Sequence, residues 1–325
     1  MSMTTTSKNE MINQHDFLNS SETELDSYNL EKARLGIIGG SGLYQIENLE
    51  NIVELSIDTP YGRPSDKLLI GNLNGMEVVF LARHGRNHTL NPSEIPYKAN
   101  IWALRSLGVR WLISASAVGS LRESIKPCDI VIPDQFIDRT HQRPLTFFSN
   151  GVVAHISMAN PFCNMLSKII TEEIKPLLNK DKKLHVGGTY LSMEGPAFST
   201  KAESNLYRSW GCSVIGMTNH TEARLAREAE IAYASLAMVT DYDCWHAQHE
   251  AVTIEMVISN LRANSVVATN IVRATAEKVA SLRPFSTAHN ALEDGLLTTK
   301  DIVPSATRLK LDLFTRSYWG KFGDS

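Results

Sequence analysis

Two aspartates, Asp241 and Asp243, follow directly on an apolar run that covers residues 231–239. Such a run is typical of a buried strand in a parallel sheet. Because successive side chains of a strand alternate between its faces, we expect the two carboxylates to point to one side. Open α/β sheets bind ligands at this end of their strands. The pair could serve as a general acid and base, ligate a metal, or accept hydrogen bonds from a ligand; the alternative is a solvated acidic loop.

Possible anion-binding groups follow two other predicted strands. Residues 35–38 lead into Gly39-Gly40-Ser41-Gly42, whose N–H groups and Ser41 hydroxyl could hold an anion. The third glycine of a dinucleotide site and the lysine of a P-loop are missing, so a simple tight turn is an equal alternative. Residues 76–81 end in Ala82-Arg83-His84-Gly85-Arg86-Asn87-His88. These arginines and histidines suit a phosphate or carboxylate, with a surface charge cluster as the alternative.

The elements that must position these groups alternate between strand and helix. A strand at 109–113 is followed by what we interpret as a loop of small and hydroxyl residues at 114–120. Further strands are expected at 128–133, 185–193 and 213–217, and helices at 96–107, 161–178, 199–210, 221–230, 253–282, 291–297 and 306–314. Thr200 and Glu203 are placed for a capping box. The alternation predicts one α/β domain over residues 34–325.

Bulk composition narrows the classes of function. With 43% hydrophobic and 21% charged residues, the 325-residue chain can form an ordinary globular core. A net charge of −3 provides no basic surface for nucleic acid. No apolar run approaches the roughly 18–20 residues of a membrane span. Residues 1–33 are polar and resemble no signal peptide, so we expect a disordered N-terminal tail on a cytoplasmic protein. Four widely spaced cysteines indicate neither a zinc site nor a disulfide framework.

Taken together, the strand-end motifs resemble the methylthioadenosine phosphorylase branch of the trimeric purine nucleoside phosphorylase family. The matching stretches, in family order between about residues 35 and 280, are Gly39-Gly40-Ser41-Gly42-Leu43, Ala82-Arg83-His84-Gly85-Arg86, Ala99-Asn100-Ile101-Trp102-Ala103-Leu104, Gly119-Ser120-Leu121-Arg122-Glu123, Asp134-Gln135-Phe136-Ile137-Asp138-Arg139-Thr140, Glu194-Gly195-Pro196 and Thr240-Asp241-Tyr242-Asp243-Cys244-Trp245. The resemblance implies a single-domain α/β fold with a mixed central sheet flanked by helices. It also implies a homotrimer that acts on a nucleoside and inorganic phosphate, without a metal or another cofactor.

The resemblance also implies roles for individual residues. The phosphate site would comprise Ser41, Arg83, His84, Ser116, Ala117 and Thr218. Met217 would contact the ribose, Phe198 and Ile215 would flank the purine, and Asp241 and Asp243 would receive the protons of its N7 and 6-amino group. The pocket for a 5′-methylthio group would comprise His155, Ile254, Val257 and Ile258, and the family borrows part of this pocket from a neighbouring subunit.

These roles fit the chemistry of N-glycosidic bond cleavage. A carboxyl group at N7 neutralises the departing purine as a general acid, and Asp241 is the candidate. A second carboxylate at the exocyclic amine favours adenine, because a 6-oxopurine would leave two acceptors facing each other. We therefore expect phosphorolysis of 5′-methylthioadenosine to adenine and 5-methylthioribose 1-phosphate. The alternatives are a 6-oxopurine nucleoside or methylthioinosine phosphorylase, a hydrolytic nucleosidase, and a non-catalytic nucleoside-binding protein.

The sequence departs from the family pattern beside this site. His220-Thr221 stands where the family usually has Leu-Pro or Val-Pro, immediately before Glu222. The missing proline removes a local backbone restraint next to Met217 and Thr218, so the shape of that loop must be set in another way.

Overall fold

The computed structural model describes residues 30–40, 49–178, 181–246 and 254–320, with side chains from residue 267 onward in the last range. Parallel strands form the centre of the described part: β4 (Met76–Ala82), β1 (Arg34–Gly39), β5 (Val109–Ser120) and β11 (Ala232–Asp241) lie side by side in that order. All ten residues of β11 are buried, as expected for a strand that is covered on both faces. Because the four strands run the same way, their C-terminal ends share one edge of the sheet.

Antiparallel strands extend this centre on the β4 side. β2 (Glu50–Leu55) pairs with β3 (Leu68–Leu73), and β3 pairs with β4. The β3–β4 connection turns at Asn74 and Gly75, which both have positive φ angles, 50° and 81°. Glycine and asparagine tolerate this left-handed backbone, which allows the tight hairpin between β3 and β4.

The opposite side of the sheet is mixed. β10 (Val214–Gly216) runs antiparallel to β5, and it is followed by β9 (Thr189–Met193) and β7 (Gln135–Arg139). β6 (Ile130–Ile132) pairs with β11 and with β8 (Leu184–Val186), which completes an 11-stranded sheet within the described residues. The expected mixed central sheet is therefore confirmed.

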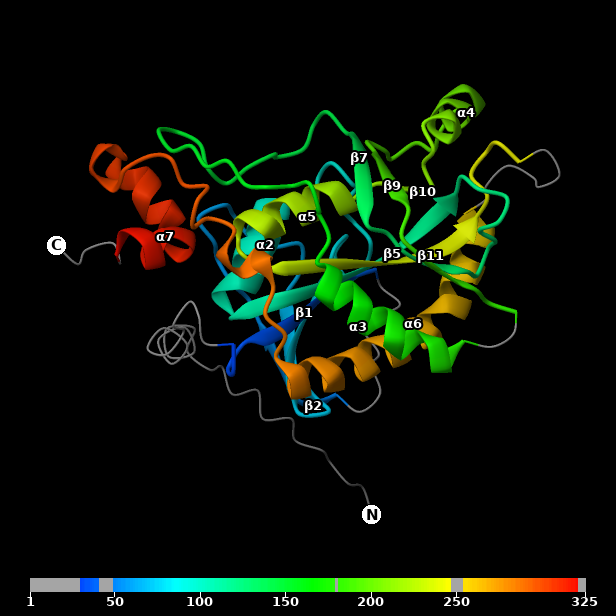
Figure 1. Cartoon of the computed structure of the whole chain (residues 1–325), viewed down its shortest axis with the longest axis horizontal. Coiled ribbons are helices and arrows are strands. Elements are labelled where there is room, and N and C mark those ends of the chain that lie inside the picture. The colour runs from blue at the N-terminus through cyan, green and yellow to red at the C-terminus, as the bar shows by residue number, and fades with distance from the viewer. Residues whose placement is uncertain (1–29, 41–48, 179–180, 247–253, 321–325) are drawn as a thin grey trace, which may run out of the picture.

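Helices cover both faces of the sheet (Figure 1). α2 (Tyr97–Ser106) and α5 (Asn219–Glu228) pack on one face through a buried cluster that includes Ile101 and Leu225. α3 (Asn164–Ile174) and α6 (Ile254–Leu282) cover the other face. The remaining helical elements are η2 (Lys175–Leu177), α4 (Lys201–Ser209), η3 (Thr287–Asn290), η4 (Lys300–Ile302) and α7 (Ser305–Trp319). None of the helices in the described ranges has the length and apolar character needed to cross a membrane.

The elements predicted from the sequence are partly confirmed and partly wrong, and local capping signals differ in this from segments whose structure depends on long-range strand pairing. The capping box of α4 is present, since Thr200 and Glu203 hydrogen-bond each other's backbone N–H groups. The loop expected at 114–120 is wrong, because these residues continue β5 between β11 and β10. The single strand expected at 185–193 is two strands, separated at Gly187 and Gly188 with φ angles of 87° and 111°. The helix expected at 291–297 is also wrong, because the 3₁₀ turn ends at Asn290.

Candidate active site

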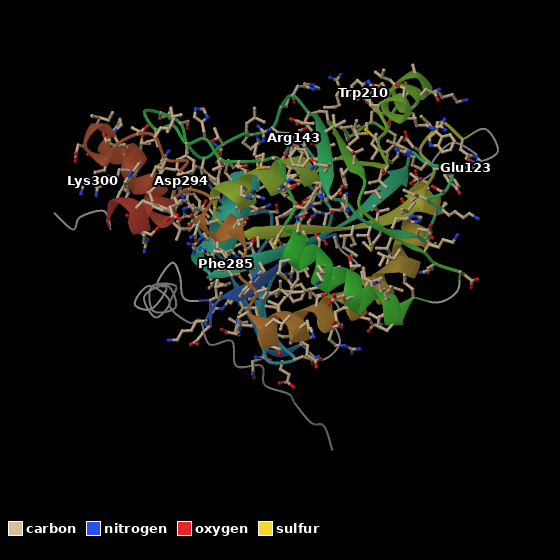
Figure 2. All side chains as sticks on the ribbon, in the orientation of Figure 1. Glu123, Arg143, Trp210, Phe285, Asp294 and Lys300 are labelled. Atoms are coloured by element: carbon tan, nitrogen blue, oxygen red, sulfur yellow. The ribbon has the colours of Figure 1, made fainter. Side chains whose placement is uncertain are left out.

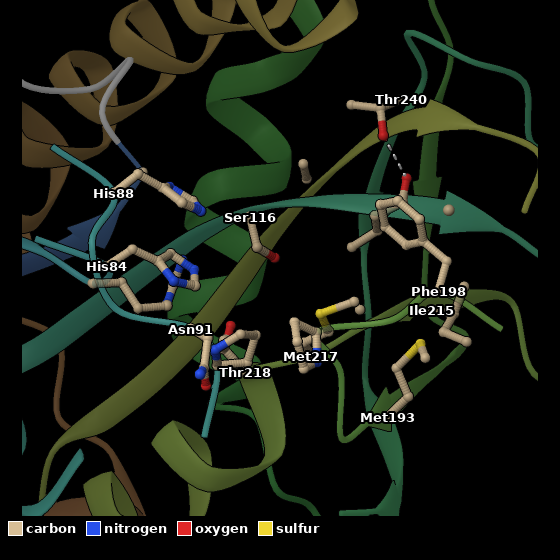
Figure 3. Close-up of a pocket in the computed structure, with 18 of the residues that line it drawn as sticks. His84, His88, Asn91, Ser116, Met193, Phe198, Ile215, Met217, Thr218 and Thr240 are labelled. Carbon is tan, nitrogen blue, oxygen red and sulfur yellow. Dashed lines mark hydrogen bonds between the residues drawn. The ribbon is translucent and has the colours of Figure 1, made fainter. Parts of the chain in front are cut away.

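A cavity of about 540 Å³ opens where the C-terminal ends of the parallel strands meet. It is lined by Gly40, Arg83, His84, His88, Thr89, Leu90, Asn91, Pro92, Glu94, Ala115, Ser116, Ala117, Val118, Gly119, Tyr190, Met193, Pro196, Phe198, Ile215, Gly216, Met217, Thr218, Met238, Thr240, Asp241 and Asp243. Figure 3 shows His84, His88 and Thr218 toward one end and Phe198, Ile215 and Thr240 toward the other, with Ser116 and Met217 between them. The two ends come from different strands and have different chemistry.

The carboxylate end is formed by Asp241 and Asp243, which are 7% and 8% exposed. Both approach Gly119 of β5: a Cβ atom at that position would lie 3.0 Å from Asp241 Oδ1 and 3.3 Å from Asp243 Cβ. The expectation that the pair shares one side is thus met. The extended backbone does not account for it, because β11 ends at Asp241 and Asp243 has a φ angle of 20°.

Burial makes both carboxylates weak acids for their type. It raises the pKa of Asp241 to about 6, helped by the nearby Asp243 and opposed by the Thr240 hydroxyl, which donates to Asp241 Oδ2 at 2.7 Å. Burial also raises the pKa of Asp243, opposed by hydrogen bonds from Ser204, the Cys244 N–H and Ser199. Its Oδ2 is buried and has no hydrogen-bond partner among the described residues. An acceptor in that condition suits a ligand that brings its own N–H donor.

Arg83 lies at the other end of the cavity and is only 2% exposed. Its Nε and Nη2 donate to the two carboxylate oxygens of Glu222, Nη2 also donates to Ser114 Oγ at 2.7 Å, and Nη1 donates to the Ala115 carbonyl at 3.2 Å. Burial lowers the pKa of Arg83, but the attraction and hydrogen bond of Glu222 outweigh this effect and raise the pKa above its ordinary value. The guanidinium therefore stays charged, with a carboxylate as its partner.

His84 lies beside Arg83 and presents a neutral ring at neutral pH. Burial, followed by the charge of Arg83, lowers the pKa of His84 to about 4. Nδ1 lies 2.8 Å from the Leu90 carbonyl, which can only accept, so Nδ1 carries the proton. The ring stacks on His88 at a centroid distance of 4.3 Å. In this tautomer Nε2 has a lone pair and acts as an acceptor.

The central wall combines β5 with the segment that enters α5. Ser116 and Ala117 belong to β5, in the stretch that the sequence had suggested to be a loop, and Thr218 directly precedes α5. Ser116 and Thr218 are 9% and 4% exposed, and all three residues line the cavity. Together they place hydroxyl groups and strand backbone near the Arg83 end.

Met217 is held against the cavity by two features that the sequence does not reveal. A Cβ atom on Gly195, which has a φ angle of 68°, would lie 2.5 Å from Met217 Sδ, so a larger residue there would displace the methionine side chain. The Met217 carbonyl accepts a hydrogen bond from Arg143 Nη1 at 3.1 Å. Arg143, labelled in Figure 2, is buried and also donates from Nε to Glu194 Oε1 at 3.0 Å.

Glu194 connects Arg143 to a second wall of the cavity. It accepts hydrogen bonds from the Ser93 hydroxyl and from the backbone N–H of His141. Although burial raises the pKa of Glu194, these hydrogen bonds and that of Arg143 lower it to about 2. Ser93 follows Pro92, which lines the cavity, so one ionised carboxylate links segments from three parts of the chain. The Glu194-Gly195-Pro196 motif was recognised in the sequence, but Arg143 as its partner was not.

The departure at His220-Thr221 is accommodated by burial. His220 is fully buried in the first turn of α5, and its N–H donates to Ser192 Oγ at 3.1 Å. Its Nε2 lies 3.3 Å from Asp138 Oδ2, and its ring contacts Phe136 edge-on at 5.0 Å. The backbone hydrogen bond to β9 and the packing of the ring on β7 fix the start of the helix where the usual proline is missing, and neither ring nitrogen of His220 has a hydrogen-bond partner among the described residues.

Several residues expected at the site lie elsewhere or outside the described part. His155 is exposed and does not line this cavity; its N–H donates to the Gly295 carbonyl at 2.8 Å. Ser41 lies outside the described residues; Gly40, which precedes it in the sequence, lines the cavity. The first turns of α6 include Ile254, Val257 and Ile258, whose side chains are not among those that the structure describes.

Known proteins match this chain over most of its length. S-methyl-5′-thioadenosine phosphorylase of Prochlorococcus marinus is 64% identical over 314 residues, which cover 96% of this chain and 99% of that protein. The enzyme of the same name from Thermosynechococcus vestitus is 57% identical over 286 residues, covering 88% and 99%. A crystal structure of a methylthioadenosine phosphorylase from an antarctic soil metagenomic library matches with a TM-score of 0.84 at 49% identity, covering 87% and 99%. Residues 34–277 match the sequence profile of the Phosphorylase superfamily, and the chain belongs to that family.

Proposed function

We propose that this protein catalyses the phosphorolysis of 5′-methylthioadenosine to adenine and 5-methylthioribose 1-phosphate. The observation that carries the proposal is a single cavity in which the buried carboxylate pair lies at Gly119 of β5, while Arg83 lies at Ala115 of the same strand, with His84 beside it. Relatives that are 57–64% identical over 88–96% of the chain have the name of this activity. The reaction needs both ends at once, because the base and the phosphate occupy opposite sides of the sugar.

Asp241 is the proposed general acid. As the C1′–N9 bond breaks, its electron pair moves into the purine, and the carboxyl proton of Asp241 passes to N7. A pKa of about 6 keeps part of the Asp241 population protonated near neutral pH, and contact with the basic N7 favours that form further. Asp243, with its unpartnered Oδ2, is the proposed acceptor for the 6-amino group. Phe198 and Ile215 would hold the two faces of the base, and both line the cavity.

Phosphate is the proposed nucleophile, with inorganic phosphate as a co-substrate and no other cofactor. An oxygen of the phosphate forms a bond to C1′ while the purine leaves, so the atoms balance without a covalent enzyme intermediate. We propose that Arg83, His84, Ser116, Ala117, Thr218 and Ser41 hold the phosphate, and that Met217 contacts the ribose. The described members of this set all line the cavity, which supports their common role.

We propose that the pocket for the 5′ end of the nucleoside is formed in part by the assembly of subunits. The family resemblance implies that His155, Ile254, Val257 and Ile258 surround the methylthio group, partly across a subunit interface. What supports a homotrimer is that His155 is exposed and absent from the cavity of its own chain, while the nearby Val153 and Leu297 are 48% and 62% exposed. A neighbouring copy could cover these apolar groups and receive the imidazole. A cytoplasmic location remains part of the proposal.

The test is adenine release with and without phosphate, measured for methylthioadenosine, adenosine and inosine. We expect no release without phosphate, and we expect inosine to react at least about 100-fold more slowly than methylthioadenosine, because its carbonyl would face the Asp243 carboxylate. Release that is independent of phosphate would identify a hydrolase instead. Tight binding of methylthioadenosine without any product in the presence of phosphate would identify a binding protein.

A further inference from the structure

We propose that Glu222, which does not line the cavity, sets the charge of its anion end by neutralising Arg83. In this view Glu222 is a positioning residue that keeps phosphate affinity moderate and the bound phosphate reactive. The inference rests on the proposed function, because it concerns the nucleophile of that reaction. The sequence alone assigned Arg83 to the phosphate without a counter-ion; the structure supplies one in Glu222.

The hydrogen bonds of Arg83 are almost fully committed within the protein. A guanidinium has five N–H groups. Arg83 uses one on Nε and two on Nη2 for Glu222 and Ser114, and one on Nη1 for the Ala115 carbonyl. Among the described residues, this leaves a single N–H on Nη1 for a ligand. The two parallel N–H donors with which arginine usually grips a phosphate already face Glu222.

Glu222 is equally committed. Its carboxylate accepts from Arg83 through both oxygens, and Oε2 also accepts from the hydroxyls of Ser114 at 2.7 Å and Tyr233 at 3.0 Å. Arg83 and Glu222 are each 2% exposed. A buried pair with this many hydrogen bonds is held firmly, and breaking it by removing one partner leaves an uncompensated charge.

The rest of the cavity does not replace the neutralised charge. Among the lining residues in the described part of the chain, Arg83 is the only lysine or arginine, whereas Glu94, Asp241 and Asp243 contribute carboxyl groups. His84 is neutral, since burial lowers its pKa to about 4. Arg143, the next arginine toward Met217, has Glu194 as its own carboxylate partner. The anion end thus offers hydroxyls, backbone, the rings of His84 and His88, and a paired arginine.

This balance has a chemical consequence for phosphorolysis. An unpaired guanidinium in a buried site attracts a phosphate dianion much more strongly than an exposed one, because the local dielectric is low. It would also withdraw charge from the attacking oxygen and would hold the sugar-phosphate product with the same strength. Interactions that stabilise the ground state as much as the transition state do not raise turnover. A neutralised arginine orients the phosphate and leaves the negative charge on the attacking oxygen, which then forms the bond to C1′.

The direction in which one substitution changes the phosphate concentration for half-saturation tests the proposal. In Glu222→Gln the shape is kept and Arg83 loses its counter-ion, so the phosphate concentration for half-saturation should fall, by roughly tenfold, and kcat should fall with it. Inorganic phosphate and sulfate should each raise the Tm of this variant more than that of the wild-type protein at equal concentration. A half-saturation concentration that rises or stays the same would overturn the proposal, since loosening of Arg83 alone gives that result.

Tyr233→Phe provides the matched control, because it removes one hydrogen bond from the same carboxylate and keeps the charge. Its half-saturation for phosphate should not fall. If it falls as far as in Glu222→Gln, the effect belongs to the hydrogen-bond network and the charge proposal is wrong.

A second comparison covers the case in which Glu222→Gln does not fold. Arg83→Met leaves the Glu222 carboxylate unpaired beneath the phosphate, whereas Arg83→Met with Glu222→Gln removes both charges. The double variant should need at least about tenfold less phosphate than the single variant, as expected for strongly coupled neighbours. A double variant that needs as much phosphate as Arg83→Met would contradict the proposal. Phosphate-induced Tm shifts report on anion binding even if the wild-type protein releases no adenine, so failure of the proposed function is recognised separately.

Discussion

The two ends of the cavity handle burial of charge in opposite ways. At the carboxylate end, Asp241 and Asp243 are buried near each other, and burial raises the pKa of both. At the anion end, Arg83 is buried as deeply but has Glu222 as a full partner. The carboxylate end is therefore incomplete until a ligand with N–H groups or a proton arrives. At the anion end it is Arg83 whose hydrogen bonds are nearly all used within the protein, so it offers a ligand a single N–H group, while the buried Ser116 hydroxyl has no partner among the described residues.

This difference assigns different tasks to the two ends. A carboxyl group with a raised pKa can carry the proton that the departing purine needs, and an acceptor without a partner can select an amine. A paired arginine can fix the position of a phosphate without binding it so tightly that product release suffers. The contrast teaches that the density of charged residues in a sequence does not indicate which of them remain available to a ligand.

The largest expected effect follows from removing the proton at the carboxylate end. Asp241→Asn should lower kcat for methylthioadenosine by about 100- to 10,000-fold, the usual range for loss of a general acid. Phosphate-induced shifts in Tm should change by much less, because the substitution lies at the opposite end of the cavity. Steady-state kinetics and thermal shifts on the same preparation test both parts. Equal losses in turnover and in phosphate binding would remove the distinction between the two ends.

A smaller effect is expected from changing the acceptor that faces the amine. Asp243→Asn can donate a hydrogen bond to a carbonyl, so the ratio of kcat/KM for methylthioadenosine to that for methylthioinosine should fall by about 100-fold. Competition between the two nucleosides in one reaction measures this ratio directly. Asp243→Glu keeps the charge and is the control. An unchanged ratio in Asp243→Asn would show that the base is selected elsewhere.

The smallest effect concerns stability and its dependence on pH. The folded-state pKa of Asp241 is about 6, above its ordinary value of 3.8. The raised pKa stabilises the folded protein fully below pH 3.8, and this stabilisation is lost as pH rises through about 6. The side chain in Asp241→Asn does not titrate. Between pH 4 and pH 8, the free energy of unfolding of this variant should therefore rise relative to that of the wild type by roughly 2 kcal/mol. Denaturant unfolding at both pH values measures this change.

A pH-independent difference between Asp241→Asn and the wild type would place the Asp241 pKa near its ordinary value. The acid role would then need another source for the proton. Asp58→Asn offers a control, because Asp58 pairs with Arg63 at an exposed position where both side chains are more than 70% exposed. Its substitution should leave the pH dependence of stability nearly unchanged.

The sequence by itself determined the strand ends and the chemistry that gathers there. Apolar runs predicted β1, β4 and β11, and Arg83, His84 and Asp241, at the C-terminal ends of β4 and β11, line the cavity. The capping signal at Thr200 and Glu203 was equally local and is present in α4. These features could be predicted because each depends on neighbours within a few residues, where side-chain alternation and backbone capping act directly.

Only the tertiary structure decided which charges are paired and how the walls are joined. Ser114 and Ser116 have the composition of a loop, yet pairing with β11 and β10 makes their segment a strand. Glu222 reaches Arg83 across 139 positions in sequence, and Arg143 reaches Glu194 across 51. No periodicity records such contacts, because they follow from how helices pack on the sheet. That packing places Glu222 against Arg83 and neutralises its charge, and it leaves the carboxylates of Asp241 and Asp243 for a ligand.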